Sequence, residues 1–262
     1  MWKSASRAAA RRCLGVLPMN EQERAPVSQG PEGREPVFLL PVSITALAGI
    51  LIAVHLASTL VLNPDGQVEL LLWFAFQPYR IVVAGFEPSI AIPLIWTPFT
   101  HAFLHAGWDH LLINVAWLVI FATPVVRRYG AGPMVSLFLI SAFGGAALFA
   151  ATTLYSQVYL IGASGGVAGL TGAAIRFMFQ PVLMARDPET GEAVVLGRRL
   201  ASLREVFANP RSRFFTLIWL ALNAAVPLVP LLTGSALSIA WQAHLGGFAA
   251  GFLLVPLFER KI

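Results

Sequence analysis

The sequence predicts an all-α polytopic membrane protein with six transmembrane helices and a long first loop that is partly embedded in the membrane. Hydrophobic residues make up 57% of the 262 residues, whereas charged residues make up only 12%, about half the share found in an average soluble domain. The mean hydropathy is +0.72. The apolar residues gather in long stretches, and most of the basic residues lie between these stretches.

Six apolar stretches match or approach the roughly 20 residues that a helix needs to cross a bilayer. They lie at residues 37–62, 111–126, 133–154, 164–184, 214–232 and 237–258. Residues 20–36, which precede the first stretch, are rich in Pro, Glu, Gln and Gly, a composition that is typical of disorder. We therefore expect a disordered cytoplasmic tail at residues 1–36, a six-helix membrane domain at 37–258 and a short cytoplasmic C-terminus at 259–262.

The Lys and Arg residues predict the orientation, because cytoplasmic loops are enriched in them. They occur in the N-terminal tail, after the second stretch, after the fourth stretch and at the C-terminus. Arg80, in the first loop, is alone on the opposite side. Six helices with both termini in the cytoplasm satisfy this alternation. We expect a multi-pass protein of the cell inner membrane.

Two alternatives follow from the basic residues. A net charge of +5 could indicate a nucleic-acid partner, but we expect none because the basic residues lie at predicted helix ends. The first 18 residues contain one Lys, three Arg and no acidic residue, as mitochondrial presequences do. The mitochondrial inner membrane is therefore the alternative location, and Met19 is an alternative start.

The first loop, residues 63–100, contains an apolar segment at 70–76 that is too short to span, followed by Trp96 and Phe99. Such a segment is typical of an interfacial or re-entrant element. A helix that merely floats at the headgroups is an equal alternative to an element beside a functional site.

Ser164 is a candidate nucleophile, in the sequence Ile-Gly-Ala-Ser-Gly-Gly from residue 161. Gly162 and Gly165 leave the hydroxyl accessible, and the start of a helix offers unpaired N–H groups to a developing oxyanion. Alone, the same pattern is more typical of a packing surface with a serine N-cap. The assignment of Ser164 therefore depends on a partner base.

His244 is the candidate base, in the sequence Ala-His-Leu-Gly-Gly from residue 243. Gly247 lies on a small-xxx-small face of its helix, and Gly165 lies on a similar face of the Ser164 helix; such faces allow helix backbones to approach closely. The two helices run in the same direction in the predicted topology. We therefore expect Ser164 and His244 within hydrogen-bond reach. Without Ser164, a histidine bonded to a backbone carbonyl would be the better interpretation.

The acidic residues limit which arrangement is possible. Neither the segment from His110 to Arg186 nor the segment from Val206 to Phe258 contains Asp or Glu. A Ser-His-Asp triad inside the membrane would lack its third member. We therefore expect a dyad whose histidine is oriented by packing.

Histidines also gather before the second helix. His110 and Asn114 are i and i+4 on one helical face, so both can present N–H donors to one point, and we expect Asp109 to cap this helix. His101 and His105 form another such pair.

The pair His101 and His105 resembles part of a zinc site, but the Glu of H-E-x-x-H is missing and no third ligand is evident. Cys13 is the only cysteine. We therefore expect no metal. The fifth histidine, His55, lies alone in the first helix, where we interpret it as a packing residue.

Together, these motifs resemble the rhomboid family of intramembrane serine proteases. They are H-x3-H-x4-H-x3-N at residues 101–114, G-x-S-G at 162–165 and A-H-x-x-G at 243–247. The resemblance covers about residues 37–258. It implies a serine endopeptidase that cleaves single-pass transmembrane proteins within or next to their spanning segment, in the lipid bilayer and without a cofactor.

The resemblance also implies a role for each site residue. Ser164 resembles the nucleophile and His244 the general base, while His110, Asn114 and the N–H of Ser164 resemble the oxyanion hole. The positions that resemble structural supports are His101, His105, Gly162, Gly165 and Gly247.

Two positions depart from the family pattern. Trp96 is followed by Thr97, where the family often has Arg, so ordering of the first loop must use other contacts. Ala168 stands four residues after Ser164, where some relatives carry an aromatic residue that stacks on the catalytic imidazole. Another group must therefore fix His244.

Two other classes of function are alternatives. A rhomboid-like protein that binds membrane clients without cutting them usually lacks the Ser or the His, and both are present here. A transporter or channel would need charged or repeated polar residues along a path, and only Arg176 qualifies. Arg176 lies about 18 Å below Ser164 at a rise of 1.5 Å per residue. We expect it to snorkel to the cytoplasmic interface.

Overall fold

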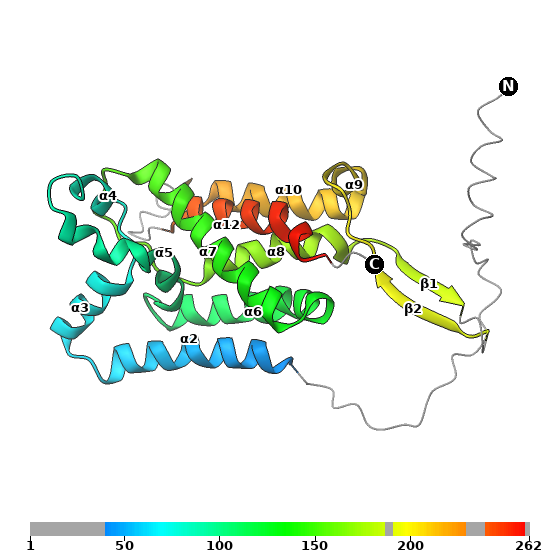
Figure 1. Cartoon of the computed structure of the whole chain (residues 1–262), viewed down its shortest axis with the longest axis horizontal. Coiled ribbons are helices and arrows are strands. Elements are labelled where there is room, and N and C mark those ends of the chain that lie inside the picture. Colours follow the sequence, from blue (N-terminus) through cyan, green and yellow to red (C-terminus); the bar gives the residue numbers. More distant parts are fainter. Residues whose placement is uncertain (1–39, 187–190, 229–238, 260–262) are drawn as a thin grey trace. The chain divides into compact units, whose positions relative to one another are not determined.

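The structure is a computed structural model that describes residues 40–186, 191–228 and 239–259 (Figure 1). It divides into two units. One contains most of a two-stranded sheet formed by β1 (Val182–Arg186) and β2 (Ala193–Arg198). The other is helical and carries every candidate site residue. The predictions for the tail at residues 1–36 and for the last three residues lie outside the described residues.

Among the residues that the structure describes, four helical segments are long and apolar enough to cross a membrane. They are α2 (Val42–Leu60), α6 (Trp108–Tyr129), α7 (Ala131–Thr153) and the segment Trp241–Phe258, which joins α12 (Trp241–Leu254) to η3 (Val255–Phe258). They correspond to the predicted first, second, third and sixth stretches. The chain is therefore a mostly helical membrane protein.

The helices described at the other two predicted spans are short, and residues 229–232 of the fifth predicted stretch lie outside the described residues. The apolar pattern predicts a fourth span that extends to residue 184, but α8 (Ser164–Met178) has 15 residues and ends before β1. The helix α10 (Pro210–Ala225) has 16 residues. At 1.5 Å per residue, α8 is about 22 Å long, less than the roughly 30 Å of a hydrocarbon core. The count of six crossings therefore stays a prediction.

The short helix α8 is the centre of the helical unit, where it packs against α6, α7 and α12 (Figure 1). Every residue from Gly165 to Phe177 is buried. A helix that contacts protein on all sides need not match the thickness of the lipid. The main core lies between α2, α6, α7 and α8 and includes Leu118, Phe138 and Leu170.

The first loop folds into short helices rather than one spanning segment. They are α3 (Pro64–Phe74), α4 (Tyr79–Val83), η1 (Pro88–Ile95), α5 (Thr97–Thr100) and η2 (His101–Phe103). The side chain of Asn63 caps α3 by accepting the N–H of Gly66 at 2.8 Å. None of the residues of α3 is buried, as expected for a segment at the surface of the protein.

Side chains from later in the loop cap the end of α3. The donors and the accepting carbonyls are Arg80 to Leu72, Trp96 to Trp73 at 2.7 Å, and Thr100 to Phe74 at 2.8 Å. The last carbonyls of a helix have no partner within the helix, so these bonds satisfy groups that would otherwise be open. These bonds are the other contacts that we expected to order the first loop, because Thr97 rather than Arg follows Trp96.

Arg176 does not snorkel, and that prediction is wrong. Its side chain is buried, its Nε donates to the carbonyl of Ala201 and its Nη1 to the carbonyl of Phe252, each at 2.7 Å. The guanidinium carbon also lies 5.4 Å from the centroid of the Phe252 ring. Five fixed donors allow one arginine to bond two backbone carbonyls at once. Arg176 thereby links α8 to α12 and to the segment before α9 (Leu203–Ala208).

Candidate active site

The helices α8 and α12 meet backbone to backbone through their glycines. A Cβ atom placed on Gly247 would lie 2.0 Å from the carbonyl oxygen of Gly165, and one on Gly251 would lie 2.0 Å from that of Gly169. Both distances are far below any van der Waals contact, so no larger residue fits. The predicted supporting role of Gly165 and Gly247 therefore has a direct steric basis.

This crossing brings Ser164 and His244 to the same end of the helix pair. Ser164 is the first residue of α8, and the next residue, Gly165, faces the carbonyl of Ala243, which directly precedes His244. In the described residues, the Ser164 hydroxyl and the His244 ring are not hydrogen-bonded to each other. The predicted proximity of the two segments is present, while the bond itself stays a prediction.

The ring of His110 and the hydroxyl of Ser164 both lie near the place that a side chain on Gly162 would take. A Cβ atom on Gly162 would be 2.8 Å from His110 Nε2 and 3.8 Å from Ser164 Oγ. Gly162 also has a φ of +119°, which glycine adopts without steric cost. Space and backbone conformation therefore both require glycine here. Because Gly162 has no side chain, the His110 ring can occupy this space beside Ser164.

The hydrogen bonds of His110 and Asn114 leave donors available. The N–H of Ala106 points to His110 Nδ1 at 3.5 Å, which makes Nδ1 the acceptor and leaves the ring proton on Nε2. Asn114 is buried and donates one amide hydrogen to the carbonyl of His110 at 2.9 Å, and its second amide hydrogen has no acceptor among the described residues. Both residues lie on α6, as predicted.

The expected cap by Asp109 is wrong. The helix α6 begins at Trp108, its N-cap is Gly107, and no side chain caps it. Asp109 lies in the first turn instead, where a carboxylate is favoured by the positive end of the helix dipole.

His101 and His105 hold the segment that precedes Ser164. The carbonyl of His101 accepts the N–H of Gly162 at 2.9 Å, and His105 Nε2 accepts the N–H of Ala163 at 3.4 Å. His101 Nδ1 in turn lies 3.0 Å from the carbonyl of Thr97. Burial lowers the pKa of each histidine to about 4. Both residues therefore bind the backbone immediately before Ser164 and hold it in place.

The absence of a metal at His101 and His105 stays a prediction. Nε2 of His105 is occupied by a backbone N–H, and no three His, Cys, Asp or Glu side chains gather at metal-binding distance in the part of the chain that the structure describes. His55 on α2 is buried and packs edge-on against Trp108, with ring centroids 4.8 Å apart, in keeping with the packing role expected for it.

The sequence interpretation missed Asn223, which lies on α10. Its Oδ1 is 2.8 Å from Nδ1 of His244. The available signal was a polar residue inside an apolar stretch, which is costly in a membrane and tends to mark function. Asn223 is the group that contacts His244 in place of an aromatic residue at Ala168.

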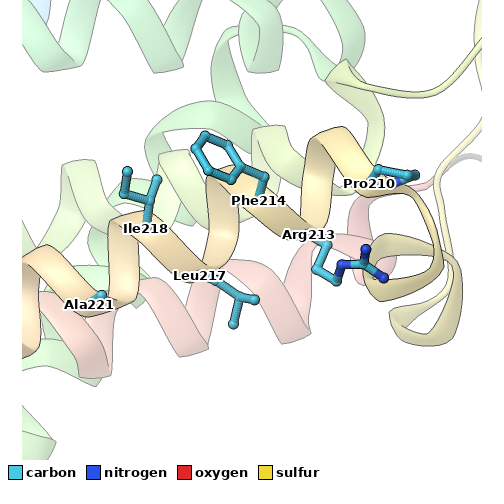
Figure 2. A pocket seen from close by; sticks show the side chains of 6 residues that line it. All are labelled: Pro210, Arg213, Phe214, Leu217, Ile218 and Ala221. Atoms are coloured by element: carbon cyan, nitrogen blue, oxygen red, sulfur yellow. The ribbon is translucent and has the colours of Figure 1, made fainter.

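The helix α10 carries a shallow hollow of about 590 Å³ (Figure 2). It is lined by Pro210, Arg213, Phe214, Leu217, Ile218 and Ala221. Phe214, Leu217 and Ile218 are exposed. Their exposure is expected for a helical face that meets lipid, and no candidate site residue takes part in it.

The chain matches known proteins over the region that holds these motifs. The family model of the rhomboid domain matches residues 94–261. RHOMBOID-like protein 1 of Arabidopsis thaliana is 30% identical over 166 residues, which is 63% of this chain and 34% of that protein. RHOMBOID-like protein 6, mitochondrial, of the same plant is 27% identical over 237 residues, 83% of this chain and 67% of that protein. The match thus spans about a third of the first relative. This chain belongs to the rhomboid family.

Proposed function

We propose that this protein is a serine endopeptidase that cleaves single-pass membrane proteins within or next to their transmembrane segment. The single observation that carries the proposal is the glycine-mediated crossing of α8 and α12, which has the G-x-S-G segment beside the A-H-x-x-G segment. A nucleophile and a base on neighbouring helices are the minimum for covalent catalysis of acyl transfer.

In the proposed mechanism, His244 Nε2 accepts the hydroxyl proton of Ser164 while Oγ attacks the scissile carbonyl carbon. The protonated His244 then gives this proton to the leaving amine, and an acyl-enzyme is left on Ser164. A water molecule, deprotonated by His244, attacks the ester carbonyl, and the serine leaves with the proton. Two proton transfers through one ring therefore balance each half of the reaction.

Three N–H groups are proposed to bind the oxyanion: Nε2 of His110, Nδ2 of Asn114 and the backbone N–H of Ser164. The first is supported by the tautomer that Ala106 favours and by the position of the ring beside Gly162. The third belongs to the first residue of α8, where backbone donors have no partner within the helix. Preorganised donors of this kind are typically the largest single contribution to acyl transfer.

The proposed setting is a lipid bilayer, with six crossings and both termini in the cytoplasm. The inner membrane of the cell is the proposed location. The mitochondrial inner membrane is the alternative. It is supported by the similarity to a plant relative whose name includes the word mitochondrial.

Cleavage of a panel of single-pass membrane proteins by the purified protein, reconstituted in liposomes, tests the proposal. We expect wild type to cleave at least one of them, and Ser164→Ala and His244→Ala each to abolish turnover, since losses on the order of 10⁶-fold are known for serine proteases. Ser58→Ala is the matched control, because Ser58 bonds only a carbonyl of its own helix in the described residues. EDTA should leave the rate unchanged.

Near-normal turnover by Ser164→Ala or His244→Ala would remove the dyad. Loss of activity in EDTA that zinc restores would favour a metal-dependent reaction. Binding of the panel proteins without cleavage by the folded wild type would favour the alternative of a client-binding rhomboid-like protein.

A further inference from the structure

His244 can act as a base only if the lone pair is on the nitrogen that faces Ser164, and the contacts of α10 bear on this requirement. The ring of His244 makes one hydrogen bond with the described residues, from Nδ1 to Oδ1 of Asn223 at 2.8 Å. Since Nδ1 is engaged by Asn223, Nε2 is the ring nitrogen left for Ser164, which lies next to the glycine at which α8 and α12 cross.

The direction of this hydrogen bond follows from the second contact of Asn223. Its Nδ2 donates to the carbonyl of Trp219 one turn earlier, at 2.8 Å. That bond orients the amide, so the atom that meets His244 is the carbonyl oxygen. An amide oxygen accepts and cannot donate. The proton must therefore be on Nδ1 of the neutral imidazole, and Nε2 retains the lone pair.

The position of Asn223 is fixed by its neighbours along α10. Trp219 stacks on Phe248, with ring centroids 4.5 Å apart and an interplanar angle of 21°. Trp219 is four residues before Asn223 and Phe248 is four residues after His244, so the two contacts are successive steps between antiparallel helices. The aromatic contact sets the register in which Asn223 meets His244.

We propose that Asn223 is a positioning residue that holds His244 in the tautomer and orientation of a general base, a role that rests on the proposed protease function. It accepts from Nδ1, keeps the ring from rotating and stabilises the positive charge that develops when Nε2 takes the serine proton. The dyad thereby becomes a Ser-His-Asn arrangement whose third member is neutral and comes from α10.

Kinetics of variants at this position test the inference. Asn223→Leu removes the acceptor and keeps the number and branching of the side-chain heavy atoms, and we expect kcat to fall while KM changes little. The fall should be about 10- to 100-fold, part of the 10²–10⁴ that a general base contributes as a whole. Asn223→Asp retains an acceptor oxygen and should recover most of kcat. Leu222→Ala is the matched control, because Leu222 is adjacent in sequence and 65% exposed.

A spectroscopic readout on the wild type does not depend on whether the variants at Asn223 fold. In protein labelled with ¹⁵N-histidine at neutral pH, the resonances that disappear in His244→Ala belong to His244. We expect its Nδ1 to be protonated and its Nε2 to be unprotonated. The reverse assignment would overturn the inference, whatever the kinetics.

The outcomes separate the inference from the proposed function. If the wild type cleaves, Ser164 is required and Asn223→Leu has an unchanged kcat, the inference is wrong while the protease function stands. If Asn223→Leu raises KM alone, Asn223 acts in substrate binding and the inference is also wrong. If the wild type cleaves nothing and Ser164 has no role, the proposed function fails first, and the ¹⁵N assignment still decides the tautomer of His244.

Discussion

At the scale of single residues, the neutral form of His105 is part of the scaffold of the site. Its Nε2 accepts the N–H of Ala163, the residue immediately before Ser164. A protonated imidazole has no acceptor, so protonation of His105 would break this bond. Burial, which lowers the pKa of His105 to about 4, keeps the ring neutral in the folded protein.

The folded protein should therefore lose stability in acid. A folded-state pKa of about 4 against an unfolded value of about 6.5 means that the unfolded chain binds more protons between these limits. The stabilisation is complete above about pH 6.5 and is lost as the pH falls towards 4, by at most about 1.4 kcal/mol per pH unit for each histidine. The melting temperature in detergent between pH 7.5 and 4.5 measures this, and His105→Gln should show a smaller decrease. Parallel decreases in both proteins would contradict it.

Asn114 is expected to act in the transition state rather than in substrate binding. An oxyanion donor strengthens its hydrogen bond only as charge develops on the carbonyl oxygen. Removal of one such donor typically costs about 10²–10³ in kcat, and less here because other donors remain. Asn114→Ala should lower kcat with KM little changed, and adding His110→Ala should be less than additive. A raised KM with unaltered kcat would assign these residues to substrate positioning instead.

The residue scale also shows where sequence reasoning stops. The motifs identified Ser164, His244, His110 and Asn114, because their spacing is a pattern along the chain. The hydrogen bond between Asn223 and His244 depends on the register between two helices, which side-chain packing across their contact determines. No periodicity in the sequence contains that register. The sequence therefore predicts that some group must orient His244, but it does not identify Asn223 as that group.

At the scale of elements, the contact of α8 with α12 depends on glycines that have no substitute. The carbonyl of Gly165 occupies the place where a side chain on Gly247 would begin. The small-xxx-small spacing predicted this approach correctly, because it is a property of one helical face at a time.

Gly247→Ala is expected to force α8 and α12 apart. Its Cβ atom would lie 2.0 Å from the carbonyl oxygen of Gly165, and overpacking of this kind typically costs about 1–3 kcal/mol. Both the melting temperature and the cleavage rate should fall. Gly49→Ala on α2 is the matched control, because nothing lies within 4 Å of the place that its methyl group would take, and it should leave both unchanged. Equal behaviour of the two variants would mean that the crossing is looser than these distances indicate.

Helix lengths are the least predictable feature at this scale. The apolar stretch that begins at Ser164 continues through Val182, Leu183 and Met184, but these residues belong to β1 and are exposed. Pro181 is the feature of the sequence that indicates the end of the helix, because the helical conformation is disfavoured for the residue before a proline. Hydropathy alone does not distinguish an apolar strand from the end of a helix.

At the scale of the whole molecule, the number of crossings is the open structural prediction. In the described part of the chain, four segments are long enough by themselves, and both a four-crossing and a six-crossing arrangement leave the two termini on the same side. The two differ in the connection after α8. With six crossings this connection is cytoplasmic, and with four it is on the same side as the connection after α7.

Cysteine accessibility distinguishes the two arrangements. In a Cys13→Ser background, Tyr155→Cys and Val195→Cys place single thiols at positions that are 79% and 62% exposed. With six crossings, a membrane-impermeant maleimide added to intact cells should label residue 155 and leave residue 195 unlabelled until the cells are lysed. Labelling of both from outside would contradict six crossings.

Covalent labelling tests whether Ser164 is a nucleophile activated by His244, and it requires no knowledge of any substrate. The folded protein is treated with a fluorophosphonate, and the modified residue is identified by mass spectrometry of its peptides. We expect one adduct, on Ser164 in wild type, that is absent from Ser164→Ala and strongly reduced in His244→Ala. An adduct on another serine, or a wild type that cleaves substrate while Ser164 remains unmodified, would contradict it.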